Sequence, residues 1–327
     1  MIRLFIQTVV LLFTYGCTAQ NHQKMKNNHP NPLLCNPEAG FCEIPSSGNP
    51  ETQIAAVEQQ KPIRIVYFTD PICSSCWGIE PQLRRLKLAY GDHFEIDYRM
   101  GGLLPSWDGF NGGGITQPLD VAQHWDEVSR YYDMPIDGSV WLEDPLHSSY
   151  PPSIAFKAAQ FQDPRKAVAF LRRIREMVFV EKKNITRWEY LEQAAMESGL
   201  DVKQLKTDFE GKAKKAFEED LDLARKMGVR GFPTLFFSNA QQQVVLYGSK
   251  PYAHFEQAIQ QLEAGAVRKE VPADFHTLFG HYPTLTTKEY ATLAGIGMAE
   301  AEKLLEHHSM LKRLTKKVTK NGVLWQY

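Results

Sequence analysis

Two cysteines separated by two residues stand where a strand-like segment gives way to a helix-like one, and this pair strongly constrains the fold. The preceding run IVYFTD predicts a buried strand, and apolar residues near helical spacing follow up to Gly91. Unpaired N–H groups at a helix N-terminus stabilise a thiolate. We therefore predict that Cys73 is the more exposed nucleophile, with a lowered pKa, and that Cys76 is the resolving thiol. The spacing alone also allows half of a zinc site or a static bridge.

The elements predicted around this pair follow the order β-α-β, a helical block, then β-β-α. FEIDYRM alternates as a second strand, and parallel strands joined by a helix form a crossover unit. Residues from about 118 to 228 carry apolar faces with a period of 3.6. TLFFSN and QVVLYG then predict two strands, and a last helix ends at Gly265. The fold class is therefore α/β with a large all-helical insertion.

A second motif, VRGFPTLFF, places Phe232 and Pro233 directly before a strand. A cis X–Pro bond at this point would expose the backbone of Phe232 beside the two sulfurs. That backbone could then pair with an incoming peptide as an added strand. A trans proline that only marks the edge of the strand is the alternative.

The segments DPICSSCWG, EKKNITRWEYLEQAAMESGLD and VRGFPTLFF together resemble the thioredoxin superfamily. The resemblance covers residues 62–265 and points to the DsbA-like branch, whose thioredoxin-like fold carries an all-helical insertion. Its motifs are similar to those of FrnE-like disulfide oxidoreductases and of the SpxH adapter family.

The resemblance implies a role for each residue of these motifs. Cys73 and Cys76 would be the catalytic pair, and Pro233 the cis-proline with Phe232 beside it. The two flanking residues, Asp70 and Trp77, would help to form the substrate surface, although a turn residue and a core residue are the plain alternatives.

Two functions follow from the resemblance. The first is a thiol-disulfide oxidoreductase or isomerase that acts on protein or peptide disulfides without a bound organic cofactor. The second is an adapter that binds a partner protein and presents it to a protease. Neither the Cys-x-x-Cys motif nor the GFPT motif specifies the redox partner or the direction of electron flow.

The N-terminus carries an apolar run that is too short to span a bilayer as a helix. It is followed by Thr-Tyr-Gly-Cys, which resembles a bacterial lipobox, so residues 1–17 predict a signal peptide with Cys17 as the lipidated residue. The protein would then lie in the cell envelope and touch the membrane only through this anchor. A translation start at Met25 would instead give a cytoplasmic protein.

Residues 18–61 are rich in Asn, Gln, Pro and Ser and predict a flexible segment. Within it lies a second thiol pair, Cys35 and Cys42, separated by six residues. The pair could form a disulfide, pass electrons to the first pair, bind zinc with His22, His29 or the first pair, or be incidental.

The last segment, residues 266–327, lies beyond the thioredoxin resemblance. Thr286 and Glu289 have capping-box spacing, a further helix follows, and Asn321-Gly322 predicts a hairpin. This order resembles a small winged-helix module. The formal net charge of −1 argues against nucleic acid as a partner. Residues 284–327 carry seven Lys and Arg against four Glu, a net charge of only +3, so a protein-docking or packing role is favoured over DNA binding.

Overall fold

The computed structural model describes residues 35–36, 41–43, 61–108 and 115–327. At its centre lies a four-stranded mixed sheet in the order β4-β3-β6-β7. Strand β3 runs parallel to β4 and antiparallel to β6, and β6 is antiparallel to β7. The strands are β3 (Ile63–Thr69), β4 (Phe94–Met100), β6 (Thr234–Ser238) and β7 (Gln243–Tyr247).

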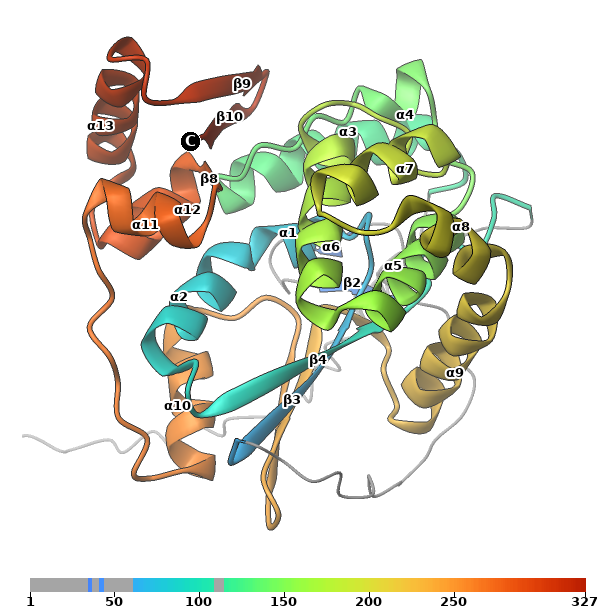
Figure 1. Ribbon diagram of the computed structural model, residues 1–327, viewed down its shortest axis with the longest axis horizontal. Coiled ribbons are helices and arrows are strands. Elements are labelled where there is room, and N and C mark those ends of the chain that lie inside the picture. The colour runs from blue at the N-terminus through green and yellow to red at the C-terminus, as the bar shows by residue number, and fades with distance from the viewer. Residues whose placement is uncertain (1–34, 37–40, 44–60, 109–114) are drawn as a thin grey trace, which may run out of the picture.

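The central strand β3 is an apolar run because helices cover both faces of the sheet. All of its residues except Arg64 are buried, which is typical of a strand covered on both faces rather than on one. Helix α10 (Tyr252–Leu262) contacts both α2 (Glu80–Tyr90) and β6, whereas α9 (Lys212–Lys226) contacts β4. Figure 1 shows α2 and α10 on the side of the sheet away from the insertion.

The helix predicted after the first cysteine pair is divided in two. Ile79 separates α1 (Ser74–Gly78) from α2, because it is the C-cap residue of the first helix and the N-cap residue of the second. Pro81 occupies the first turn of α2, where a missing N–H removes no helical hydrogen bond. A Cβ atom placed on Gly78 would lie 2.5 Å from the ring of Tyr132, so α1 packs in close contact with the helix that ends at Tyr132.

The insertion between β4 and β6 is helical, as the period of 3.6 predicts. Prolines occupy the first turns of its first, third and fourth helices. Residues of the insertion and of the sheet share one continuous hydrophobic core. The helices are α3 (Pro118–Tyr132), α4 (Val140–Glu143), α5 (Tyr150–Gln162), α6 (Pro164–Phe179), α7 (Trp188–Glu197), α8 (Val202–Glu210) and α9.

The C-terminal segment forms a module with a hydrophobic core of its own. The predicted capping box between Thr286 and Glu289 is present, and so is the predicted hairpin, but its turn is formed by residues 320 and 321, because Gly322 already pairs with Thr319 as the first residue of the second strand. The first helix and the first strand of this module were not predicted from the sequence. The elements are α11 (Phe275–His281), β8 (Thr284–Thr286), α12 (Thr287–Ala294), α13 (Met298–Met310), β9 (Thr315–Thr319) and β10 (Gly322–Gln326), with the sheet order β8-β10-β9.

A buried carboxylate, Glu289, joins this module to the rest of the protein. Glu289 is fully buried and accepts two hydrogen bonds from Arg172, at 2.8 and 3.0 Å. Its Oε1 also lies 3.2 Å from Nε of Arg84, which in turn donates to the carbonyl of Thr284. The module is therefore held by paired charges from both α2 and α6.

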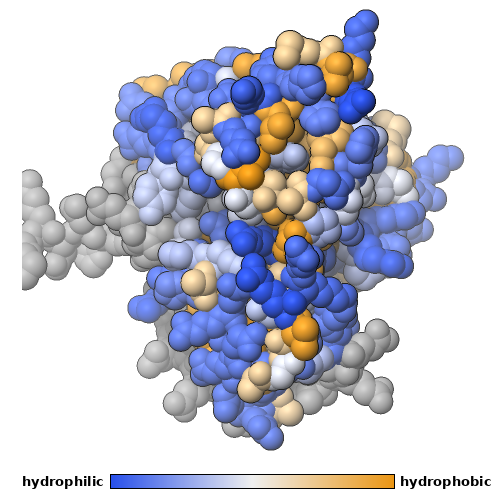
Figure 2. Space-filling view, turned by 90° about the vertical axis from the view of Figure 1, so that its left-hand side faces the viewer, coloured by the Kyte–Doolittle hydropathy of each residue, from blue (hydrophilic) through white to orange (hydrophobic). Residues whose placement is uncertain are grey.

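The surface formed by the C-terminal module and α10 is mostly hydrophilic. Figure 2 shows this face, on which apolar residues are interspersed among hydrophilic ones. None of the helices in the described part of the chain is long and apolar enough to cross a membrane.

Candidate functional site

The first cysteine pair lies at the end of β3, where the chain turns into α1. Cys73 is the N-cap residue of α1, and its Sγ accepts a hydrogen bond of 3.2 Å from the backbone N–H of Cys76. Both cysteines are 0% exposed, and Cys76 is a free thiol. The pair thus sits at a helix N-terminus, as the sequence predicts, but below the surface.

This burial changes the expected electrostatics of the pair. Burial, followed by the hydrogen bond and charge of Cys76, raises the pKa of Cys73 well above its ordinary value. Burial also opposes ionisation of Cys76, but the hydrogen bond from Cys73 and the charge of Arg175 prevail and lower its pKa. The predicted exposed, acidic Cys73 is therefore wrong for this conformation, in which the thiolate is favoured on Cys76.

A buried arginine, Arg175, lies beside the cysteine pair and was not among the predicted site residues. Arg175 reaches from α6 to Glu80 at 2.7 Å, to Oγ1 of Thr69 at 2.5 Å and to the carbonyl of Asp70. Its positive charge is one cause of the lowered pKa of Cys76. No local sequence motif predicts this role of Arg175, because its partners lie about a hundred positions away in the chain.

Asp70 has a structural role in place of the predicted substrate contact. Its Oδ1 accepts from the N–H of Ile72, and its Oδ2 accepts from the N–H of Leu103 and from Oγ of Ser149, both at 2.8 Å. The carboxyl is fully buried, and this burial raises its pKa to about 6. Asp70 therefore ties the loops after β3 and β4 to the start of α5.

Trp77 is likewise a core residue rather than part of an exposed substrate surface. Its indole N–H donates to the carbonyl of Pro135 at 3.1 Å, and its ring stacks on Phe179 with 5.5 Å between centroids. The guanidinium of Arg172 lies 4.3 Å above the same ring. The side chain is 0% exposed, so it joins α1 to the insertion.

The GFPT motif forms a short strand, β5 (Gly231–Phe232), and the Phe232–Pro233 peptide bond is cis. Phe232 and Pro233 are both buried. The backbone of β5 is paired with a strand from the N-terminal segment, β2 (Phe41–Glu43), in the register Cys42 with Phe232 and Glu43 with Gly231. The backbone expected to accept an incoming peptide is therefore occupied by the chain itself.

The second thiol pair is brought to this same edge of the molecule. Strand β1 (Cys35–Asn36) pairs with β2 so that Cys35 and Cys42 are directly opposite. Residues Cys17, His22 and His29 lie outside the described residues. Within the described part, no group of three or more His, Cys, Asp or Glu side chains is placed to hold a metal ion.

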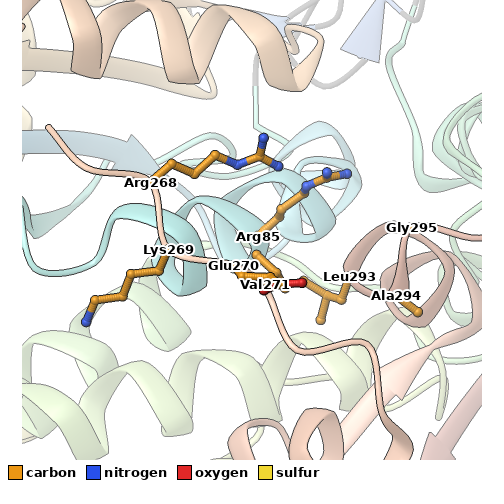
Figure 3. Close-up of a pocket in the computed structure, with 8 residues that line it drawn as sticks. All are labelled: Arg85, Arg268, Lys269, Glu270, Val271, Leu293, Ala294 and Gly295. Atoms are coloured by element: carbon orange, nitrogen blue, oxygen red, sulfur yellow. The ribbon is translucent and has the colours of Figure 1, made fainter.

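A surface cavity of about 350 Å³ borders the floor of the thiol site, because Glu80 and Arg175 line it. Other cavities lie further from the cysteines. One, of about 400 Å³, is formed where the linker after α10 passes between Arg85 of α2 and the end of α12. Figure 3 shows the side chains of Arg85 and Arg268 on the same side of this linker, with Lys269 pointing away. None of its lining residues belongs to α1 or β5, so this cavity is separate from the thiol site.

Comparison with known proteins places these features in a family. Residues 67–257 match the family model described as Thioredoxin. The ClpXP adapter protein SpxH of Halalkalibacterium halodurans is 34% identical over 92% of this chain and 99% of its own length. The ClpXP adapter protein SpxH of Bacillus subtilis is 29% identical over 82% of this chain and 90% of its own length.

Two solved structures share the fold of the thioredoxin part. A putative protein disulfide isomerase from Nitrosomonas europaea has a TM-score of 0.52 with 20% identity, covering 62% of this chain and 96% of its own. The cytosolic disulfide reductase DsbM from Pseudomonas aeruginosa has a TM-score of 0.50 with 21% identity, covering 62% of this chain and 97% of its own. With its cysteine pair at the end of β3, its helical insertion and its long match to the adapters, this chain belongs to the SpxH family within the thioredoxin superfamily.

Proposed function

We propose that this protein is an adapter that binds a client protein and presents it to the protease ClpXP. The observation that carries the proposal is the closed state of the thiol site. Cys73 and Cys76 are both fully buried, and the backbone of Phe232 is already paired with Cys42. An enzyme that turns over protein disulfides needs this edge open to its substrates, whereas an adapter does not.

The extent of the family likeness supports the same function. The H. halodurans relative aligns over 92% of this chain, which includes most of the C-terminal module, whereas the disulfide isomerase structure covers 62%. The buried contact of Glu289 with Arg172 makes this module a fixed part of the molecule. A rigid module beside the thioredoxin part provides the extended surface that binding two proteins at once requires.

Protein half-lives in cells that lack this protein provide the test. An adapter predicts that one or a few proteins become long-lived, and that their turnover returns with the wild-type gene. The Cys73→Ser/Cys76→Ser double variant should restore turnover equally well. Purified ClpXP should then degrade the identified client faster when this protein is added. Unchanged half-lives throughout the proteome, or failure of the double variant to restore turnover, would contradict the adapter function.

A second function, thiol-disulfide exchange with protein or peptide substrates, is favoured by the electrostatics of Cys76. The hydrogen bond from Cys73 and the charge of Arg175 lower the pKa of this thiol although it is fully buried, and a lowered thiol pKa is typical of reactive cysteines. The exchange would use only the two cysteines and no bound organic cofactor. Opening of the β5 edge would have to precede it.

A glutathione redox titration of the purified protein tests this second function. A reversible two-electron transition that is lost in Cys73→Ser is the expected result. Zinc measured on the same sample separates exchange from metal binding. Thiols that retain zinc and do not titrate would exclude exchange without affecting the adapter function.

A further inference from the structure

We propose that the Cys35–Cys42 pair is an internal disulfide substrate of the Cys73–Cys76 pair, presented on β5 as an added strand. This activity within one chain goes beyond adapter function and beyond exchange with other proteins. It rests on three features of the backbone: the register of β1 with β2, the register of β2 with β5, and the position of β2 beside α1.

The register of the N-terminal hairpin suits a disulfide. Cys35 and Cys42 are directly opposite in an antiparallel pair. Residues so placed have Cα atoms about 4.5–5.5 Å apart. Disulfide-bonded cysteines have Cα atoms about 4.4–6.8 Å apart, so a bridge between Cys35 and Cys42 needs no movement of the backbone.

The position of β2 is that of a peptide bound by strand addition. Its Cys42 pairs with Phe232, the residue before Pro233, and the strand order β1-β2-β5 leaves β1 one strand further out. Cα atoms of β2 also lie within 8 Å of Cα atoms of α1, the helix that contains Cys76 and is capped by Cys73. Main-chain pairing of this kind fixes which residue of an extended peptide stands at the site. Here that residue is a cysteine.

The exchange is balanced within the chain. Cys73 passes its proton to the Cys76 thiolate as its sulfur attacks that of Cys42, so a Cys73–Cys42 bond forms and Cys35 leaves as a thiolate. Cys76 then loses this proton to the Cys35 thiolate and attacks the sulfur of Cys73, the Cys73–Cys76 bond forms, and Cys42 leaves as a thiolate. Two electrons pass to the Cys35–Cys42 pair, and the protons lost by the attacking thiols are taken up by the leaving thiolates. No outside oxidant or reductant is consumed.

The order of the strands selects the sulfur that is attacked. Cys42 lies on the strand paired with β5, whereas Cys35 lies on the outer strand. The mixed disulfide should therefore join Cys73 to Cys42 and not to Cys35. This selectivity distinguishes presentation on β5 from random contact of a tethered segment.

Trapping the mixed disulfide tests the proposal. In the full chain with Cys17→Ser, the change Cys76→Ser removes the resolving thiol and should leave the Cys73–Cys42 bond in place. After mild oxidation with glutathione disulfide, acid quenching and alkylation, cleavage after glutamate isolates Cys42 in the peptide of residues 39–43. Cys35 remains in residues 1–38 and Cys73 in residues 59–80, so mass spectrometry identifies each bond.

The expected result is a Cys73–Cys42 bond within single chains. Tethered groups have effective concentrations in the millimolar range, so at about 10 µM protein this bond should exceed bonds between chains about 100-fold. Adding Cys42→Ser should remove it without an equal yield of the Cys73–Cys35 bond. If Cys76→Ser does not fold, Cys76→Ala provides the same trap. Bonds from Cys73 to Cys35 and Cys42 in equal yield, or no bond from Cys73 to either, would overturn the proposal.

A measurement on the chain with Cys17→Ser alone completes the test. One equivalent of reductant added to the oxidised protein should be redistributed between the two pairs with a rate constant that does not depend on protein concentration. A rate constant that rises in proportion to protein concentration would show exchange between molecules and would contradict presentation on β5.

Discussion

The ring of Phe232 occupies the space in which a side chain at Gly101 would lie. A Cβ atom placed on Gly101 would stand 1.8 Å from Cζ of Phe232, and Phe232 is fully buried. The residue that follows β4 therefore determines the position of the ring on β5. Since β2 pairs with the backbone of Phe232, this contact also supports the strand that covers the thiol site.

Gly101→Ala should destabilise the protein, because the ring of Phe232 must move within a filled core. We expect the free energy of unfolding to fall by about 1–3 kcal/mol, as in other overpacked sites. Urea denaturation followed by tryptophan fluorescence measures it. Gly280→Ala is the matched control, because a Cβ atom there has no neighbour within 4 Å and helix α11 gains a better helix former. Equal stability of the two variants would contradict the contact.

Removal of the Arg175 charge should raise the pKa of Cys76. The guanidinium favours the thiolate, so Arg175→Gln should move its titration to higher pH. Ultraviolet absorbance of the thiolate, with the titration of Cys76→Ser subtracted, measures this change. Arg165→Gln, an exposed residue on the same helix, is the control and should leave the titration where it is. The proposed link between α6 and the thiol site fails if both variants titrate like the wild type.

Asp70 should make the stability of the protein fall as pH rises from about 4 to above 6. Its buried carboxyl has a pKa of about 6, above the value of about 3.9 in an unfolded chain, so the folded state keeps a proton that the unfolded state loses. A difference of about two pKa units corresponds to about 3 kcal/mol, present at low pH and lost through this window. Denaturation measured across this pH range should show this loss of stability in the wild type and not in Asp70→Asn. A constant difference between the two proteins would contradict the raised pKa.

Glu289→Ala should loosen the C-terminal module. The change leaves Arg84 and Arg172 without their buried carboxylate and removes half of the capping box of α12. Breaking a buried ion pair in this way costs about 3–5 kcal/mol. Urea denaturation gives the loss, and limited proteolysis should find new cleavage between α10 and α11. Exposed Glu302→Ala on α13 is the control, expected within about 0.5 kcal/mol of the wild type.

Much of the fold could be predicted because the periodicity of the sequence is local. The apolar run before Asp70 gave strand β3, the helical block began and ended within a few residues of its predicted limits, and the capping box of Thr286 and Glu289 marked α12. The break at Ile79 escaped prediction because it separates two segments that both carry helical periodicity.

The residues of the candidate site could be predicted from the sequence, but their burial and their pKa shifts could not. Cys73 and Cys76 lie just beyond the end of β3, and Phe232 and Pro233 lie just before β6, the strand that pairs with β3. Burial of Trp77 could not be predicted, because its partners Pro135 and Phe179 lie on the insertion.

By itself the sequence determined the elements and the chemistry available to them, since strand and helix periods and a Cys-x-x-Cys spacing are properties of neighbouring residues. Only the tertiary structure decided which thiol is favoured as the thiolate and what occupies β5. Arg175 acts on Cys76 from about a hundred residues away, and Cys42 pairs with Phe232 across most of the chain. Such contacts depend on the packing of whole elements, and no local pattern encodes them.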